Sequence, residues 1–368
     1  MARHITSLKI NGYRGLRDFA VEDLADVNIL LGDNNCGKTS VLEVLNAFSA
    51  ITNPAKWLNN SAHRNFIYQE LNPCVDLSHL FNINEPEMPI SIEYIAKDKA
   101  NRFRLSHSDD TVSLDLKSIQ GLDRYAYSRL RRNFLFADES GFDEGNIIRS
   151  YAHSTMTFSL NDEPEVSTEF FEFTTKISTN KHKVVKLFAA EYEYPYRYIT
   201  APFDLTLIFD KPDMYEELIA VLQQFDPDIT NVFADKDNVY KIASRSSKKA
   251  LPVSVFGDGL KLALSLFSAL PFAKNGFLLI DEFDTSLHTS QIGKVLGTII
   301  TMCKRMNIQL FMTTHSLEAV DRVIECCTER LDDLRVIRLN KKPERTFAKV
   351  IHGELAEELR NVNDAELR

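Results

Sequence analysis

The stretch Val27-Asn28-Ile29-Leu30-Leu31-Gly32-Asp33-Asn34-Asn35-Cys36-Gly37-Lys38-Thr39-Ser40 joins an apolar run to the pattern G-x-x-x-x-G-K-T. Apolar residues then recur at helical spacing, at positions 41, 44, 45, 48 and 51. Strand, glycine-rich turn and helix in this order indicate a phosphate-binding loop, because glycines let backbone N–H groups turn inward and the helix N-terminus adds positive potential. The alternative, that Gly32 and Gly37 are ordinary turn residues, is weakened by the flanking strand and helix.

The residue types of this loop indicate which atoms would hold a nucleotide. Lys38 would reach the β- and γ-phosphates, and the Thr39 hydroxyl would coordinate Mg²⁺. Further candidates for nucleotide contacts are Asn34, Asn35, Gly37 and Ser40.

The composition is that of an ordinary globular protein, with 368 residues of which 44% are hydrophobic and 26% charged. The length suffices for two cores or one elaborated core. The first residues contain no apolar export segment and no stretch could span a membrane, so a cytoplasmic location is expected. The five cysteines are odd in number and lack metal-type spacing, which indicates reduced thiols.

The formal net charge of −9 argues against a protein whose whole surface wraps nucleic acid, but it leaves room for a local basic patch. One candidate cluster has Arg124, Arg129, Arg131 and Arg132 interleaved with tyrosines. The other comprises Lys241, Arg245, Lys248 and Lys249. Solvated surface explains each cluster, taken alone, better than a binding site does.

A short apolar strand, residues 276–280, ends in Asp281 and Glu282, which is the form of a Walker B segment. Asp281 could help to hold Mg²⁺ through its water shell, and Glu282 could orient and polarise the attacking water. Acidic residues also follow strands as helix caps, but the phosphate loop elsewhere in the chain favours the catalytic interpretation.

The C-terminal third alternates regularly between helices and strands. Helical spacing over 292–306 precedes a strand at 308–312, and a helix at 317–324 precedes a strand at 334–339. This alternation predicts a parallel, doubly wound α/β sheet whose ligand sites lie at the carboxyl ends of the strands, where Gly32, Asp281 and His315 would meet. We therefore predict a functional role for His315, whereas His288 fits a structural role equally well.

A small polar loop, residues 254–259, precedes a very apolar helix at 262–270 that Pro271 is expected to end. Its backbone N–H groups would point out of the start of the helix and form a second anion-binding element. A plain glycine turn that caps a core helix is the alternative.

Taken together, these motifs resemble the ABC-type ATPase head of the RecF, SMC and overcoming-lysogenization-defect (OLD) group. The order of phosphate loop, long insertion, signature loop, Walker B, D-loop and switch histidine extends over essentially the whole chain. The opening segment, residues 5–16, is similar to the first strand of such heads, with Arg14 in the position of its arginine. The branch with "GDG" in the signature and "TTHS" at the switch resembles this chain most and includes ATPase components of bacterial anti-phage systems.

The resemblance implies a P-loop NTPase of the ABC-ATPase head type, with a mixed or parallel sheet, an antiparallel β-lobe and an α/β insertion. It also implies ATP and Mg²⁺ as cofactors and a homodimer, or a larger homo-oligomer, that shares its ATP sites. Ser254, Gly257, Asp258 and Gly259 would then contact the γ-phosphate held by the other subunit, and His315 would sense that phosphate. Arg14 joins the candidate nucleotide contacts on the same basis.

This chain departs from the family pattern at several positions. The D-loop, residues 284–288, has Asp284 where glutamate is usual and Thr289 follows where proline is usual, while Phe283 replaces proline or isoleucine. The pair Asp281 and Glu282 is intact, so we expect hydrolysis, with slow turnover as an alternative. The glutamine that contacts Mg²⁺ in such heads is assigned to Gln69, although an exposed helical glutamine explains this residue more simply.

The pattern divides the chain into an N-terminal part of the head (1–52), a β-lobe edge with an inserted arm (53–250) and a C-terminal part of the head (251–368). Strands are expected at 90–95, 103–105, 112–116, 150–160 and 170–177, and a helix at 214–225. No sustained heptads occur, so the long coiled coil of SMC-like proteins is not expected. The acidic run 138–144 fits a solvated loop better than a metal site.

OLD nucleases carry a metal-dependent TOPRIM domain after the head, and 53 residues follow His315 in this sequence. Any nuclease or toxin activity is therefore expected in a separate polypeptide. The leading hypothesis is an ATPase that controls such an effector, plausibly in phage defence. The alternatives are a RecF-like DNA-binding repair module and an ATP-binding scaffold with little turnover.

Overall fold

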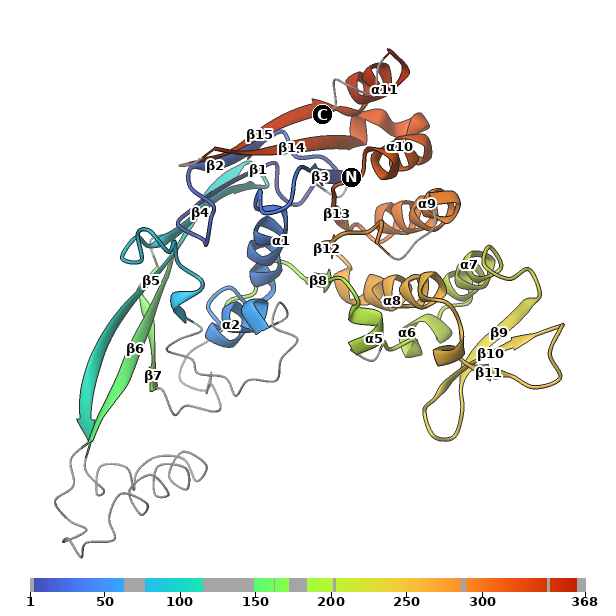
Figure 1. The fold of residues 1–368 in the computed structure, drawn as a ribbon, viewed down its shortest axis with the longest axis horizontal. Helices are drawn as coiled ribbons and strands as arrows, with labels where there is room; N and C mark the ends of the chain where they lie inside the picture. The colour runs from blue at the N-terminus through green and yellow to red at the C-terminus, as the bar shows by residue number, and fades with distance from the viewer. Residues whose placement is uncertain are drawn as a thin grey trace, which may run out of the picture.

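The computed structural model describes residues 3–62, 77–114, 149–161, 163–171, 184–200, 203–285, 289–342 and 345–362. Two six-stranded sheets and one three-stranded sheet make up its β-structure. Figure 1 shows a lobe with a long two-stranded extension on one side, and a stack of helices with a small arm on the other.

The core sheet has the spatial order β15-β14-β3-β13-β12-β8. Its strands are β3 (Val27–Leu31), β8 (Ala190–Glu193), β12 (Phe277–Ile280), β13 (Gln309–Thr314), β14 (Leu334–Lys342) and β15 (Arg345–His352). All neighbours pair in parallel except β15, which is antiparallel to β14. The sheet is therefore parallel around β3 and β12, the strands that precede the phosphate loop and the Walker B carboxylates.

Every residue of β3 and β12 is buried, because both faces of the sheet are covered. Val27 and Ile29 belong to one hydrophobic core, with the helices that follow the signature loop and β12. Leu30 points to the other core, which the first helix and the lobe complete. Alternate residues of a strand thus enter different cores, as the period of two requires.

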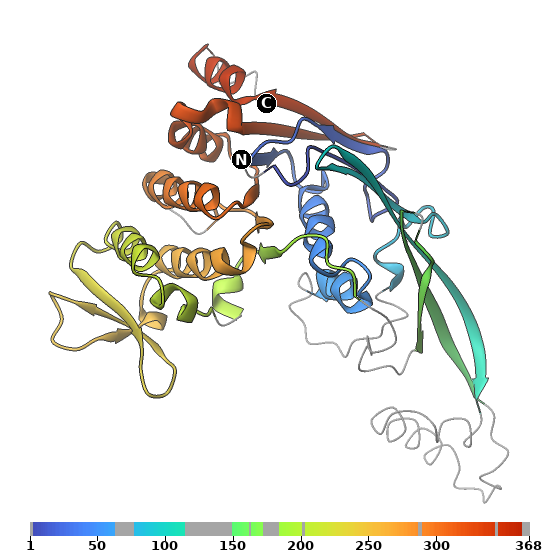
Figure 2. The ribbon, with the colours of Figure 1, turned by 180° about the vertical axis from the view of Figure 1, so that it is seen from behind.

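The lobe sheet is antiparallel throughout, with the order β2-β1-β4-β5-β6-β7. Its strands are β1 (Ser7–Asn11), β2 (Phe19–Glu22), β4 (Ile90–Ala96), β5 (Lys99–Leu114), β6 (Arg149–Leu160) and β7 (Val166–Phe171). Figure 2 shows β5 and β6 extending together away from the core sheet.

The helices cover the core sheet on both faces (Figure 1). On the lobe side lie α1 (Lys38–Ala47), the 3₁₀ turn η1 (Phe48–Ala50) and α2 (Pro54–Ala62). On the other side lie α8 (Asp258–Ala273), α9 (Thr289–Arg305) and α10 (Leu317–Cys326). The C-terminal part also contains η4 (Thr328–Asp333) and α11 (Gly353–Val362).

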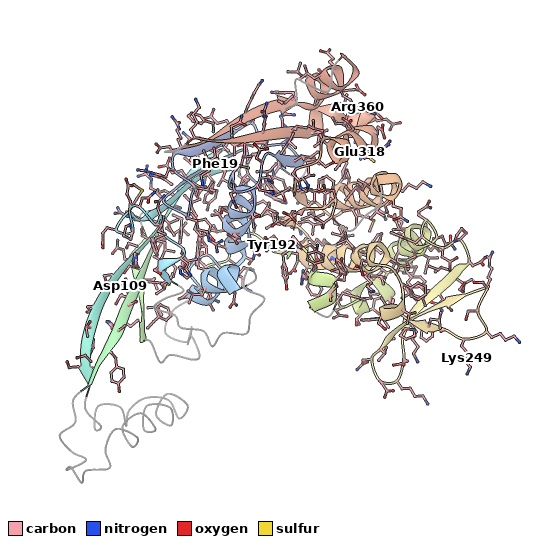
Figure 3. All side chains as sticks on the ribbon, in the orientation of Figure 1. Phe19, Asp109, Tyr192, Lys249, Glu318 and Arg360 are labelled. Atoms are coloured by element: carbon pink, nitrogen blue, oxygen red, sulfur yellow. The ribbon has the colours of Figure 1, made fainter. Side chains whose placement is uncertain are left out.

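A small arm is built before α8. It comprises α5 (Arg197–Thr200), α6 (Thr206–Phe209), α7 (Pro212–Leu222), the sheet of β9 (Ile229–Ala234), β10 (Tyr240–Ser244) and β11 (Leu251–Pro252), and the turn η3 (Val253–Val255). Figure 3 labels Lys249 at the outer end of this arm.

The mixed α/β architecture predicted from the sequence is confirmed, but several local predictions are wrong. Pro271 does not end α8, which runs to Ala273, because a proline in the last turn removes just one helical hydrogen bond close to the end. Residues 103–105 and 112–116 are not separate strands, since β5 runs unbroken from Lys99 to Leu114. The strand expected at 170–177 begins earlier, at Val166, and its described part ends at Phe171.

Segment 53–250 contributes strands to all three sheets. The division of the chain into three parts at residues 52 and 250 stays a prediction. In the part of the chain that the structure describes, the helices are too short or too polar to cross a membrane.

Candidate nucleotide site

The phosphate loop joins β3 to α1 and holds its lysine close to its own backbone. Lys38 Nζ donates hydrogen bonds to the carbonyl oxygens of Gly32 (2.7 Å) and Asp33 (2.9 Å). Its third contact, with Cys36 Sγ, is long at 3.9 Å. Because an ammonium group has three N–H donors, a phosphate oxygen could replace this weak contact without displacing the other two.

The backbone of the loop requires glycine at Gly37. Its φ is +101°, and an added Cβ would lie 2.6 Å from Leu16 Cδ2. Asn35 also has a positive φ, +63°, which asparagine tolerates better than most residues. Two left-handed residues close together turn the chain sharply into α1, which begins at Lys38.

Asp281 lies at the end of β12 and accepts hydrogen bonds from three hydroxyl groups of three different elements. Thr313 Oγ1 (2.5 Å) and Thr39 Oγ1 (3.3 Å) contact Oδ1, and Tyr192 Oη (3.0 Å) contacts Oδ2. A buried carboxylate beside the Thr39 hydroxyl offers the hard oxygen ligands that Mg²⁺ prefers, so the residues fit this ion.

Glu282 follows with φ +49°, in the left-handed region that a glutamate rarely adopts. Its N–H donates to Thr313 Oγ1 (2.8 Å), and its carbonyl accepts from Thr285 Oγ1 (2.9 Å). Burial, and then the charge of Asp281, raise the pKa of the Glu282 carboxyl above its ordinary value, while His315 acts in the opposite direction. Strained backbone and a perturbed carboxyl are features of catalytic sites.

The switch segment follows β13. Thr314 Oγ1 donates to Asp284 Oδ1 (2.8 Å) and accepts from the N–H of Ser316 (3.0 Å), which in turn caps α10. His315 is exposed between them. It lines a hollow of about 680 Å³ together with Gly32, Asp33, Arg338 and other residues. The structure therefore brings the predicted switch histidine to the phosphate loop.

Arg14 is held by a residue that the sequence did not single out. Its Nη1 lies 3.1 Å from Glu43 Oε2 on α1, and Tyr13 Oη donates to the same oxygen (3.0 Å). Glu43 is 1% exposed. This contact fixes Arg14 against the helix behind the phosphate loop, and its contact with a nucleotide stays a prediction.

Of the predicted signature residues, Gly257, Asp258 and Gly259 lie at the start of α8, and Ser254 lies in the preceding turn η3. Ser254, Gly257 and Asp258 are exposed, and Gly259 is half-buried. Residues of α8 and of α1 belong to different cores on opposite faces of the core sheet (Figure 1). The two predicted anion-binding elements of one chain thus lie beside different cores.

Several predicted residues lie outside the described part of the chain: Gln69, His288, the arginines at 124–132 and the acidic run 138–144. Of the D-loop, residues 284 and 285 are described. Among the described residues, no three His, Cys, Asp or Glu side chains form a group suited to a metal ion. A bound Mg²⁺ would therefore need oxygens from the nucleotide and water.

Sequence reasoning missed Tyr192 and the role of Thr313. Figure 3 labels Tyr192 near the middle of the molecule, where β8 lies beside β12. The position of Thr313 at the start of the TTHS segment could have drawn attention, but nothing in the sequence marks Tyr192.

Comparison with known proteins finds a matching family and several similar proteins. Residues 27–321 match the family model described as "AAA domain, putative AbiEii toxin, Type IV TA system". A Helicobacter pylori protein described as an ATP/GTP phosphatase is 23% identical over 353 residues, which cover 87% of this chain and 88% of the relative. An uncharacterized Methanocaldococcus jannaschii protein is 30% identical over 112 residues, 30% of this chain and 98% of that protein.

Among solved structures, an SMC head bound to the C-terminal winged-helix domain of ScpA superimposes with a TM-score of 0.50. The alignment covers 96% of this chain and 99% of that chain at 11% identity. At this identity the likeness concerns the fold alone.

Proposed function

We propose a function on the premise that the chain belongs to the AAA domain family of the AbiEii type, whose model spans residues 27–321. The chain is a P-loop ATPase with the fold of ABC-type heads. We propose that two copies close on shared ATP and Mg²⁺, that hydrolysis reopens them, and that this cycle controls a separate effector.

The observation that carries the proposal is the meeting of the loop and the Walker B carboxylates. Thr39 Oγ1 and Asp281 Oδ1 are 3.3 Å apart, and Glu282 follows directly. Lys38 would stabilise the negative charge of the phosphates, and Glu282 would accept a proton from the attacking water. Mg²⁺, when bound near Thr39 and Asp281, would neutralise charge on the phosphates.

The first test replaces Glu282 by glutamine, which keeps the shape but cannot accept the proton. We expect phosphate release to fall by a factor of about 10² or more, while ATP still binds. Glu216→Gln, an exposed position on α7, removes the same charge and serves as the control. Normal phosphate release from the Glu282→Gln protein would refute the assigned role.

A composite site formed by two copies is supported by the position of the signature residues. The start of α8 is exposed and lies on the face of the core sheet opposite α1. Its N–H groups are therefore available to phosphates held by another subunit. The name of the Helicobacter relative supports nucleoside triphosphate hydrolysis.

The proposal of a separate effector, acting in anti-phage defence, is supported by the family description, which names a toxin. If ATP-driven closure recruits the effector, a tagged Glu282→Gln protein should retain it in the native host. A tagged Lys38→Ala protein should lose it. Equal recovery of the same partner with both variants would contradict ATP control, and recovery of none would contradict the effector itself.

A further inference from the structure

The pair β14 and β15 carries an unusual face. In its antiparallel register Arg338 lies opposite Lys349, Asn340 opposite Phe347, and Lys342 opposite Arg345. Directly opposite residues, and alternate residues along each strand, share a face of the sheet. Two pairs of cations therefore flank one Asn–Phe pair. These six residues are called the basic face below.

The basic face is open to solvent. Lys342, Arg345 and Lys349 are exposed, and Phe347 is 38% exposed. Lys342 Nζ lies 5.1 Å and Arg345 Cζ 4.9 Å from the centroid of the Phe347 ring. The opposite face of the strand pair is directed inward, with Ile337 and Leu339 in the core. A large aromatic ring is thus kept at the surface between cations.

Positive charge predominates on the basic face, although Asp33 and Glu318 line the same hollow as Arg338. Residues 338–349 contain five Lys or Arg and one Glu, in a chain with a net charge of −9. Among the residues that the structure describes, no carboxylate forms an ion pair with Arg338, Lys342, Arg345 or Lys349. By contrast, Lys241 on the arm lies 2.7 Å from Asp235. Clustered cations without such partners attract a polyanion.

We propose that the basic face binds single-stranded nucleic acid. Alternate residues along a strand are about 6.8 Å apart, so the two cation pairs lie about 13 Å apart with Phe347 between them. Phosphates would contact the cation pairs, and a base would stack on the ring. A base within a duplex is already stacked on its neighbours and cannot cover Phe347, so the aromatic group favours single strands.

The basic face also reaches the nucleotide site. Arg338 and Asn340 line the hollow that contains Gly32 and His315. One end of a bound strand would therefore lie beside the phosphate loop, close to a nucleotide bound there. The proposal itself does not rest on ATP hydrolysis, and binding can be measured without nucleotide.

The test uses the full chain and a fluorescein-labelled deoxythymidine strand of about 20 nucleotides, enough for a binding site of this kind. Fluorescence anisotropy gives the dissociation constant over a series of salt concentrations. The Lys342→Ala/Arg345→Ala/Lys349→Ala protein should bind at least tenfold more weakly. Loss of three phosphate contacts should also reduce the slope of log K against log salt by about 2. Phe347→Ala should weaken binding about tenfold with an unchanged slope, and Phe347→Tyr should restore it.

The matched control is Arg245→Ala/Lys248→Ala/Lys249→Ala, which removes the same charge from the arm. Figure 3 places Lys249 at the far end of the arm, well away from β14 and β15. This control should bind like the unchanged protein, and thermal unfolding should show that all variants are folded.

Four results would overturn the proposal: no binding of the strand by the unchanged protein, loss of binding in the arm variant instead, equal or tighter binding of a duplex of the same length, or displacement of the strand by a polyglutamate peptide at equal charge. Glu282→Gln should bind the strand normally. Normal hydrolysis by the Glu282→Gln protein would therefore refute the catalytic role of Glu282 but would not affect the proposal of strand binding by the basic face.

Discussion

At the scale of single residues, Thr313 connects the carboxylate of Asp281 with the backbone of Glu282 through one oxygen atom. Its hydroxyl donates to Asp281 Oδ1 and accepts from the N–H of Glu282. The same atom therefore positions a candidate metal ligand and holds the left-handed backbone of the candidate base. Thr313 is fully buried, so water cannot replace these bonds easily.

Thr313→Val keeps the shape of the side chain but leaves both partners without this hydrogen bond. We expect the free energy of unfolding to fall by about 1–3 kcal/mol, together with a loss of phosphate release. Thr313→Ser should restore most of both, because it retains the hydroxyl. Thr298→Val on the exposed side of α9 is the control. Unchanged hydrolysis in Thr313→Val would show that this link is dispensable.

The pH dependence of hydrolysis should report the pKa of Glu282. Burial, and then Asp281, raise this pKa above the ordinary value of 4.5. The carboxylate must be deprotonated to accept a proton, so activity is present above the raised pKa and is lost as the pH falls through it. The acid limb of kcat at saturating ATP should therefore lie above pH 4.5. An acid limb at or below that pH, with the fold intact by circular dichroism, would contradict this expectation.

At the scale of elements, the apolar runs predicted β3, β12 and β13 well, because a buried parallel strand needs apolar residues on both faces. The motifs at their ends predicted that the phosphate loop, Asp281 and His315 lie at one edge of the sheet, and in the structure Thr39 contacts Asp281 while His315 shares a hollow with Gly32. The roles of these residues stay predictions. The contact of Tyr192 with Asp281 could not be predicted, because it depends on which distant strand lies next to β12. The pairing of β8 with β12 leaves no mark in the sequence around Tyr192.

The full length of β5 in the ribbon that it forms with β6 was also not predicted from the sequence. Residues 106–111, Ser-His-Ser-Asp-Asp-Thr, lack the apolar residues that indicate a strand, so strands were predicted on either side of them and not through them. Phe103 and Leu105 near the base of the ribbon are buried and give the recognisable part of the pattern. Hydrogen bonding with β6 extends the strand well beyond the residues that packing specifies.

Substitution of two glycines by alanine should have different effects, one on stability and the other on hydrolysis. An added Cβ at Gly276, where β12 begins, would lie 2.1 Å from the carbonyl oxygen of Ala189. Gly276→Ala should therefore lower the melting temperature strongly.

Gly257, at the start of α8, has φ −66° and nothing within 4 Å of an added Cβ. Gly257→Ala should keep the melting temperature within a few degrees but nearly abolish hydrolysis, since the methyl group would enter the space of the proposed second subunit. Normal hydrolysis in Gly257→Ala would argue against a signature role.

At the scale of the whole molecule, a site shared between two copies predicts complementation. Lys38→Ala disables the loop of one copy, and Gly257→Ala disables the signature of the other. A mixed dimer would then contain one site in which both halves are intact. An equimolar mixture of the two proteins should recover about one quarter of the normal rate, although each variant alone is nearly inactive. Phosphate release measured after mixing gives this fraction.

The same experiment contains its own control. Each variant mixed with more of itself should gain nothing, and dilution of the active mixture should lower the rate per molecule. A mixture that stays as inactive as its components would mean that each chain completes its own site.

The position of β3 between β13 and β14 determines when, during synthesis, the nucleotide site can be completed. Asn28 Nδ2 donates to the carbonyl oxygen of Leu310, 282 positions later in the chain. During synthesis the phosphate loop therefore leaves the ribosome long before the strands that flank its own strand exist. Contacts so distant in sequence form late and slowly. The nucleotide site of a nascent chain therefore cannot be complete until the flanking strands β13 and β14, which end at Thr314 and Lys342, have been synthesised.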